Sequence, residues 1–110
     1  MGAIEPTAKE IAFADVWIYI CAIARKDGSK PFNRLSGAYY IEAGSWELWI
    51  NGTLADLPKN GEHPPIPRFN CYVKFNGWPA GFFDPHTCTL AAGGLANIFT
   101  LRDALKERAT

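Results

Sequence analysis

The dipeptide Asn76-Gly77 lies between two apolar runs, FNCYVKF and WPAGFF, and this arrangement is the strongest constraint on the fold. A two-residue type I′ turn needs positive φ at both central residues, which asparagine and glycine adopt most readily. The sequence therefore predicts a β-hairpin that turns at Asn76-Gly77. Tyr72 would lie across from Gly81 and cover its bare backbone. The apolar pairs expected on one face are Phe75 with Trp78, Val73 with Ala80, and Cys71 with Phe82.

Two strand patterns precede the hairpin and one follows it. AYYIEA and SWELWI are separated by Gly44-Ser45, and the second run alternates with the period of a strand. CTLAA follows a turn at residues 84–87 and reads as a short strand. Residues 51–68 contain four prolines and are expected to form a long loop. Ordered loops of this length commonly carry function.

The N-terminal segment has the signals of a helix. Thr7 and Glu10 fit a capping box, and Asp27-Gly28 is a natural stop, so we expect a helix from about Ala8 to Lys26. Residues 16–23 are apolar on all sides and rich in β-branched side chains, so a helix that breaks near Asp15 and continues as a strand is the alternative.

A second capping-box pattern, Thr100 to Asp103, predicts the start of a C-terminal helix. In LRDALKERA the inward residues would be Leu101, Ala104 and Leu105. The expected fold class is therefore α+β: an N-terminal helix, an antiparallel meander of four to five short strands, and a C-terminal helix. At 110 residues the chain is expected to form a single domain over positions 1–110.

Composition narrows the classes of partner. The 11 basic and 11 acidic residues cancel, whereas a protein that binds duplex DNA carries a basic surplus and a DNA mimic an acidic one. No direct nucleic-acid binding is therefore expected. The N-terminus lacks a signal-peptide pattern and the apolar segment is too short to span a bilayer, which predicts a cytoplasmic protein. Neither the three cysteines nor the histidines, His63 and His86, form a disulfide or metal-ligand pattern, so no cofactor is expected.

Two groups of residues are candidates for catalysis. His86 and Cys88 share a face if they lie on a strand, which would suit a cysteine nucleophile. The favoured interpretation is a turn histidine followed by a small apolar cysteine, without catalysis. The carboxylates Glu42, Glu47 and Asp84 lie on or near predicted strands, but nothing in their spacing forces them together. We expect them on solvated faces.

Aromatic side chains are the best candidates for a binding site. Strand alternation places Trp46, Phe75, Trp78 and Phe82 on the inward face of the meander. It places Trp49, Tyr72 and Phe83 on the opposite face, where exposed rings favour a protein interface. We expect these three to bind a partner with help from the loop Thr53–Arg68, including His63 and Arg68. The alternative is that the N-terminal apolar segment covers this face.

The motifs FNGWPAGFFDP and LAAGGLAN, followed by a short C-terminal helix, resemble small proteins carried by phages and other mobile elements. The resemblance covers about residues 69–105. Anti-CRISPR and related anti-defence inhibitors are the nearest class, which implies steric binding to a host protein or protein complex in the cytoplasm of the host cell. The resemblance carries over no catalytic residue. The function expected is thus a non-enzymatic protein-binding module. A small-ligand or nucleotide-binding domain with an aromatic-lined pocket and a small cysteine-dependent hydrolase are the alternatives.

Overall fold

The computed structural model describes residues 5–27, 39–51, 70–91 and 93–110. Helix α1 spans Ala8–Lys26. The Thr7 side chain accepts a hydrogen bond from the Glu10 amide at 3.1 Å, and the Thr7 amide donates to Glu10 Oε1 at 3.0 Å. This is the predicted capping box, which satisfies two amides that a helix start leaves unpaired. Residues 16–23 continue the same helix, so the alternative of a break near Asp15 is wrong.

Five strands form one antiparallel sheet in the order β1-β2-β3-β4-β5. Their bounds are β1 Tyr39–Ala43, β2 Trp46–Asn51, β3 Asn70–Phe75, β4 Trp78–Asp84 and β5 Thr89–Leu90. Each strand pairs with its neighbour in sequence, so the predicted meander is confirmed. Asn76 and Gly77 have φ values of 52° and 78°, the two positive angles that a type I′ turn requires. Phe75 pairs with Trp78 across this turn, as predicted.

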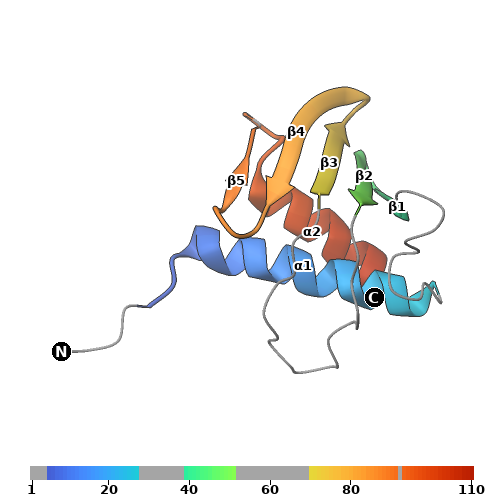
Figure 1. The fold of residues 1–110 in the computed structure, drawn as a ribbon, viewed down its shortest axis with the longest axis horizontal. Coiled ribbons are helices and arrows are strands. Elements are labelled where there is room, and N and C mark those ends of the chain that lie inside the picture. Colours follow the sequence, from blue (N-terminus) through green and yellow to red (C-terminus); the bar gives the residue numbers. More distant parts are fainter. Residues whose placement is uncertain (1–4, 28–38, 52–69, 92) are drawn as a thin grey trace.

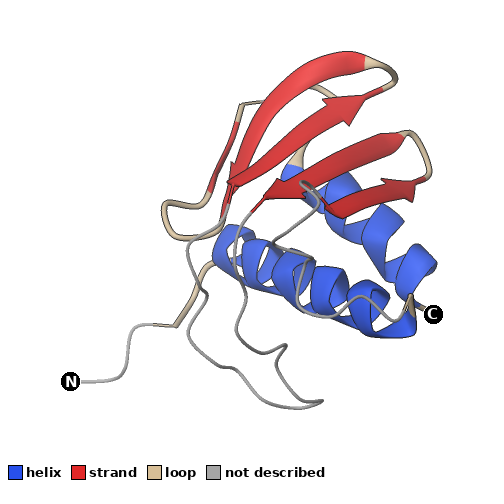
Figure 2. Ribbon diagram, turned by 45° about the vertical axis from the view of Figure 1, so that its right-hand side comes forward, coloured by secondary structure: helices blue, strands red, loops and turns tan. Residues whose placement is uncertain are grey.

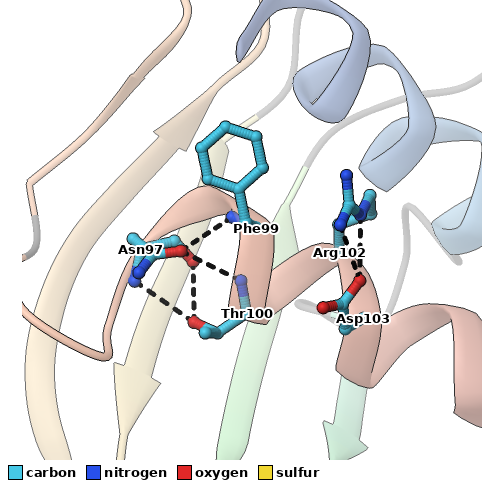
Figure 3. Close-up of polar contacts among 5 residues, drawn as sticks. All are labelled: Asn97, Phe99, Thr100, Arg102 and Asp103. Atoms are coloured by element: carbon cyan, nitrogen blue, oxygen red, sulfur yellow. Dashed lines mark hydrogen bonds and ion pairs between the residues drawn. The ribbon is translucent and has the colours of Figure 1, made fainter. Parts of the chain in front are cut away.

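Helix α2 spans Ile98–Ala109, and its N-cap, Asn97, lies three residues before the predicted cap at Thr100. Asn97 is its N-cap: Asn97 Oδ1 accepts from the amides of Phe99 and Thr100, both at 3.0 Å (Figure 3). The Thr100 hydroxyl in turn accepts from the Asn97 amide at 3.3 Å (Figure 3). Thr100 therefore completes the cap from the third helical position, which adds the buried Ile98 to the helix.

Both helices cover the same side of the sheet (Figures 1 and 2). The core between these two layers contains apolar residues from one side of α1, from α2 and from the inward face of strands β1 to β4. Leu101 and Leu105 of α2 are fully buried in it, as expected, and Ala104 packs against it. The architecture is an α+β fold in two layers, with the second face of the sheet covered by no described helix or strand.

The hairpin β3–β4 departs from its predicted register at one point. Tyr72 pairs with Phe82 and Val73 with Gly81, while Lys74 pairs with Pro79, so Ala80 is an extra residue in β4. This β-bulge shifts every later residue of β4 to the opposite face. The predicted pairs Val73–Ala80, Cys71–Phe82 and Tyr72–Gly81 are therefore wrong.

The ends of the two helices meet at Asp27, the C-cap of α1. The Tyr39 hydroxyl donates to Asp27 Oδ2 at 2.7 Å, and Arg108 Nη2 lies 3.3 Å from Asp27 Oδ1. These hydrogen bonds, the one from Tyr39 first, hold the pKa of Asp27 below its usual range even though partial burial opposes them. One carboxylate thus ties α1, α2 and β1 together at one end of the molecule.

Candidate binding surface

Four aromatic side chains lie side by side on the outward face of the sheet, one from each of strands β1 to β4. We call Tyr40, Trp49, Tyr72 and Phe82 the aromatic row. Each ring is the register partner of the next across the strands. The ring centroids are 5.2 Å apart for Tyr40 and Trp49, 5.8 Å for Trp49 and Tyr72, and 5.5 Å for Tyr72 and Phe82. These separations are in the range of favourable aromatic pairs, so the rings support one another across the sheet.

The two ends of the aromatic row are the most open to solvent. Tyr40 is 41% exposed and Phe82 is 58% exposed, while Trp49 and Tyr72 between them are half-buried. Trp78, in the hairpin beyond Phe82, is 77% exposed. Exposed apolar surface of this kind, contiguous over several strands, is typical of interaction sites.

A second row of side chains runs beside the first and carries charge. Glu42, Glu47 and Lys74 are register partners in sequence across β1, β2 and β3. The Tyr40 hydroxyl donates to Glu47 Oε2 at 2.9 Å and lies 3.2 Å from Glu42 Oε2. The hydrogen bond to Glu47, which favours the protonated phenol, is the main reason that the pKa of Tyr40 rises to about 12.

Lys74 does not form an ion pair with its register partner Glu47. Its Nζ lies 5.4 Å from the centroid of the Trp49 ring, a cation–π arrangement. Within residues 5–27, 39–51, 70–91 and 93–110, neither Glu42 nor Glu47 has a cationic partner. Two carboxylates therefore face each other across β1 and β2 beside the aromatic row.

The predicted site residues separate into three groups. Trp49 and Tyr72 lie on the outward face, as expected. The placement of Phe83 on that face is wrong: its side chain is 1% exposed and stacks on Phe13 of α1, with centroids 5.5 Å apart and rings inclined by 7°. His63 and Arg68, with the rest of the loop Thr53–Arg68, lie outside the described residues.

The bulge explains the misplaced phenylalanines. Because Ala80 is inserted, Phe82 turns outward and Phe83 turns into the core, the reverse of the prediction. Of the four residues predicted to point inward, Trp46 is buried and Phe75 packs against the core, but Phe82 and Trp78 are exposed. The sequence carried one signal for this bulge, because a glycine inside a strand pattern often marks one. Gly81 is that glycine, and its φ of +82° is in the left-handed region.

Tyr40 is the residue of the aromatic row that the sequence analysis did not single out. It immediately precedes Ile41, which is buried, so strand alternation alone would have placed it outward. Its two carboxylate partners, Glu42 and Glu47, were expected on a solvated face and lie there. Their convergence on one hydroxyl required the observed register of β1 and β2, which the two-residue turn at Gly44-Ser45 sets.

Cys88, with His86, was the one cysteine considered for nucleophilic chemistry. Cys21 and Cys71 are buried and Cys88 is half-buried, all as free thiols. Burial raises the pKa of Cys21 to about 12 and raises that of Cys71 further. Burial, with help from the Glu10 carboxylate, also raises the pKa of Cys88, whose Sγ lies 3.8 Å from the Pro85 carbonyl oxygen. A raised pKa disfavours the thiolate that a nucleophile needs.

The described part of the chain holds neither a metal cluster nor a membrane-spanning helix. No group of three or more histidine, cysteine, aspartate or glutamate side chains there is arranged to hold a metal ion. No described helix is both long and apolar enough to cross a membrane. Comparison with family models, curated proteins and solved structures gave no match.

Proposed function

We propose that the chain is a non-enzymatic protein-binding module that recognises its partner through the outward face of the sheet. The observation that carries the proposal is the aromatic row, which is contiguous over four strands and open at both ends. Tyrosine, tryptophan and phenylalanine are enriched at protein interfaces because they add large contact area at little cost in side-chain entropy. The helices occupy the other side, so a partner can reach this face without unfolding the core.

A row of rings on a sheet also suits single-stranded nucleic acid, and the charges decide between the two classes. Platforms that stack bases sit in positively charged grooves that follow the phosphates. Here the row beside the rings carries two carboxylates, Glu42 and Glu47, and a single cation, Lys74. Phosphates would meet a net negative charge on these three described residues, which favours a protein partner.

The resemblance of residues 69–105 to anti-CRISPR and other anti-defence proteins extends the proposal to an inhibitor of a host defence complex. Such an inhibitor works by steric binding, for which a rigid two-layer scaffold and one aromatic face are sufficient. Its partner would be a host protein or protein complex in the cytoplasm. Motif residues of the resemblance form the type I′ turn and the bulge of the scaffold, and one of them, Phe82, also belongs to the aromatic row.

The test is single alanine substitution along the aromatic row. Trp49→Ala, Tyr72→Ala and Phe82→Ala are expected to stay folded by circular dichroism and to weaken binding to the partner. Aromatic anchors at the centre of an interface typically cost about 2 kcal/mol or more when truncated. The partner is first identified by affinity capture from the native host cell and mass spectrometry, and is then purified for titration.

Phe83→Ala is the matched control, because Phe83 adjoins Phe82 in sequence but lies in the core. We expect it to lower the free energy of unfolding by about 3–5 kcal/mol, with loss of binding only where the fold is lost. Three folded variants of the aromatic row that bind the purified partner as tightly as the parent would disprove this function.

A further inference from the structure

Glu42 and Glu47 place two like charges opposite each other on the proposed binding face. The two residues are direct register partners across β1 and β2, where like charges oppose each other unfavourably. Both lie within hydrogen-bond distance of the Tyr40 hydroxyl, which has only one proton to donate. The pair therefore keeps most of its capacity to accept hydrogen bonds.

The described cation that pairs in register with Glu47 does not contact its carboxylate. Lys74 is the register partner of Glu47, yet its ammonium group rests over the Trp49 ring. The aromatic row thus attracts a cation of the chain itself at its middle, while the end that holds Tyr40, Glu42 and Glu47 has none among the described residues.

We propose that this end of the aromatic row receives an arginine side chain from the protein partner. The inference rests on the proposed function and names the chemistry of the partner: a segment with an exposed arginine flanked by apolar residues. The guanidinium group stacks flat on an aromatic ring and directs its N–H groups at the carboxylates of Glu42 and Glu47. Arginine suits both contacts, because its planar fork matches carboxylates and its face packs on rings.

Other occupants fit the same groups less well. A phosphate-bearing ligand would be repelled by the two carboxylates. A hard metal ion such as Ca²⁺ takes six or more oxygen ligands, and the described residues offer no cluster of three acidic or other ligating side chains here. A lysine ammonium can pair with one carboxylate, but it lacks the flat surface and the fork.

The test uses small probes and the whole chain. N-acetyl-arginine amide, the lysine analogue and the neutral citrulline isostere are titrated into ¹⁵N-labelled protein and followed by NMR. We expect saturable shifts at the Tyr40, Glu42 and Glu47 amides and at the Trp49 indole N–H, at least fivefold weaker in affinity for lysine and absent for citrulline. Equal shifts with arginine and citrulline, or no arginine-dependent shift at these positions, would overturn the inference.

Two variants test whether the arginine-dependent shifts depend on the carboxylates of Glu42 and Glu47. Glu42→Lys places a cation opposite Glu47 and is expected to abolish arginine binding while leaving the protein folded. Glu107→Gln removes an exposed carboxylate from α2 and is expected to change nothing, as the matched control. Arginine binding that survives Glu42→Lys unchanged contradicts the inference.

Titration with the purified partner distinguishes failure of this inference from failure of the proposed function. If Trp49→Ala weakens partner binding but Glu42→Lys does not, the sheet face is the interface and the arginine contact is wrong. If neither substitution changes partner binding, the proposed function itself fails. Loss of partner binding in both variants, with arginine-dependent shifts in the parent, supports the two together.

Discussion

Gly81→Ala tests the bulge that brings Phe82 into the aromatic row. Gly81 has φ of +82°, and a Cβ built there would lie 2.9 Å from the Cβ of Ala91. Gly77, with φ of +78°, has nothing within 4 Å of such an atom. An alanine at either position therefore carries the backbone penalty of a positive φ, and only an alanine at position 81 adds a steric clash.

The magnitude follows from these two contributions. A residue with a Cβ in the left-handed region costs about 1–2 kcal/mol, from which about 0.4–1 kcal/mol is recovered because the unfolded chain becomes less flexible. Gly77→Ala should then lower the free energy of unfolding by about 1 kcal/mol. Forcing a methyl group against the short, inflexible Ala91 side chain adds about 1–3 kcal/mol. Gly81→Ala should therefore cost about 2–4 kcal/mol in total.

The assay is equilibrium unfolding in urea, followed by tryptophan fluorescence and circular dichroism, for both single variants and for Gly81→Ala combined with Ala91→Gly. Removal of the Ala91 methyl group should relieve the clash and bring the double variant close to the cost of Gly77→Ala. The double variant can also be compared with Gly77→Ala if Gly81→Ala alone does not fold. The reasoning is refuted if Gly81→Ala is as stable as the parent, or if Ala91→Gly restores none of the loss.

Three further outcomes are expected. Asp27→Asn should lower the free energy of unfolding by about 0.5–1 kcal/mol at pH 7. Because the pKa of Asp27 is lowered in the folded state, its contribution is present above the ordinary value near 3.8 and is lost as the pH falls through the lowered value. Urea unfolding between pH 2 and 7 should accordingly show a shallower acid loss in the variant. Glu42→Lys should raise the free energy of unfolding by about 0.2–1 kcal/mol in thermal melts, since it replaces the repulsion with Glu47 by attraction. Cys88→Ser should keep both fold and partner binding; loss of the biological effect with the fold intact would favour the hydrolase alternative.

The sequence predicted the elements whose signals are local. Thr7 and Glu10 mark the start of α1 by their own hydrogen bonds, and Asn76-Gly77 marks its turn by backbone preference. The second helix shows the limit of such signals. Asn97 and Thr100 are both good N-cap residues, and only the observed hydrogen bonds show that the first caps the helix while the second completes the box.

The residues of the binding face could be predicted only up to the bulge in β4, because strand alternation changes face there. Trp49 and Tyr72 precede the bulge and were placed correctly, whereas Phe82 and Phe83 follow it and exchanged faces. Two adjacent phenylalanines give the same pattern in either register, so hydrophobicity alone could not choose between them. The close approach of Gly81 to Ala91, which joins β4 to the segment after β5, is a tertiary contact that no local pattern reports.

The separation of α1 from β4 along the sequence affects how the protein is made. Phe13 of α1 has no stacking partner until β4 exists, since it stacks on Phe83. At about 5–20 residues per second, a ribosome leaves Phe13 without this partner for roughly 4–14 s. The hairpins, by contrast, close over two-residue turns in about 1–10 μs once their strands are available. During synthesis, chaperones or other apolar chains can therefore reach Phe13 before β4 covers it.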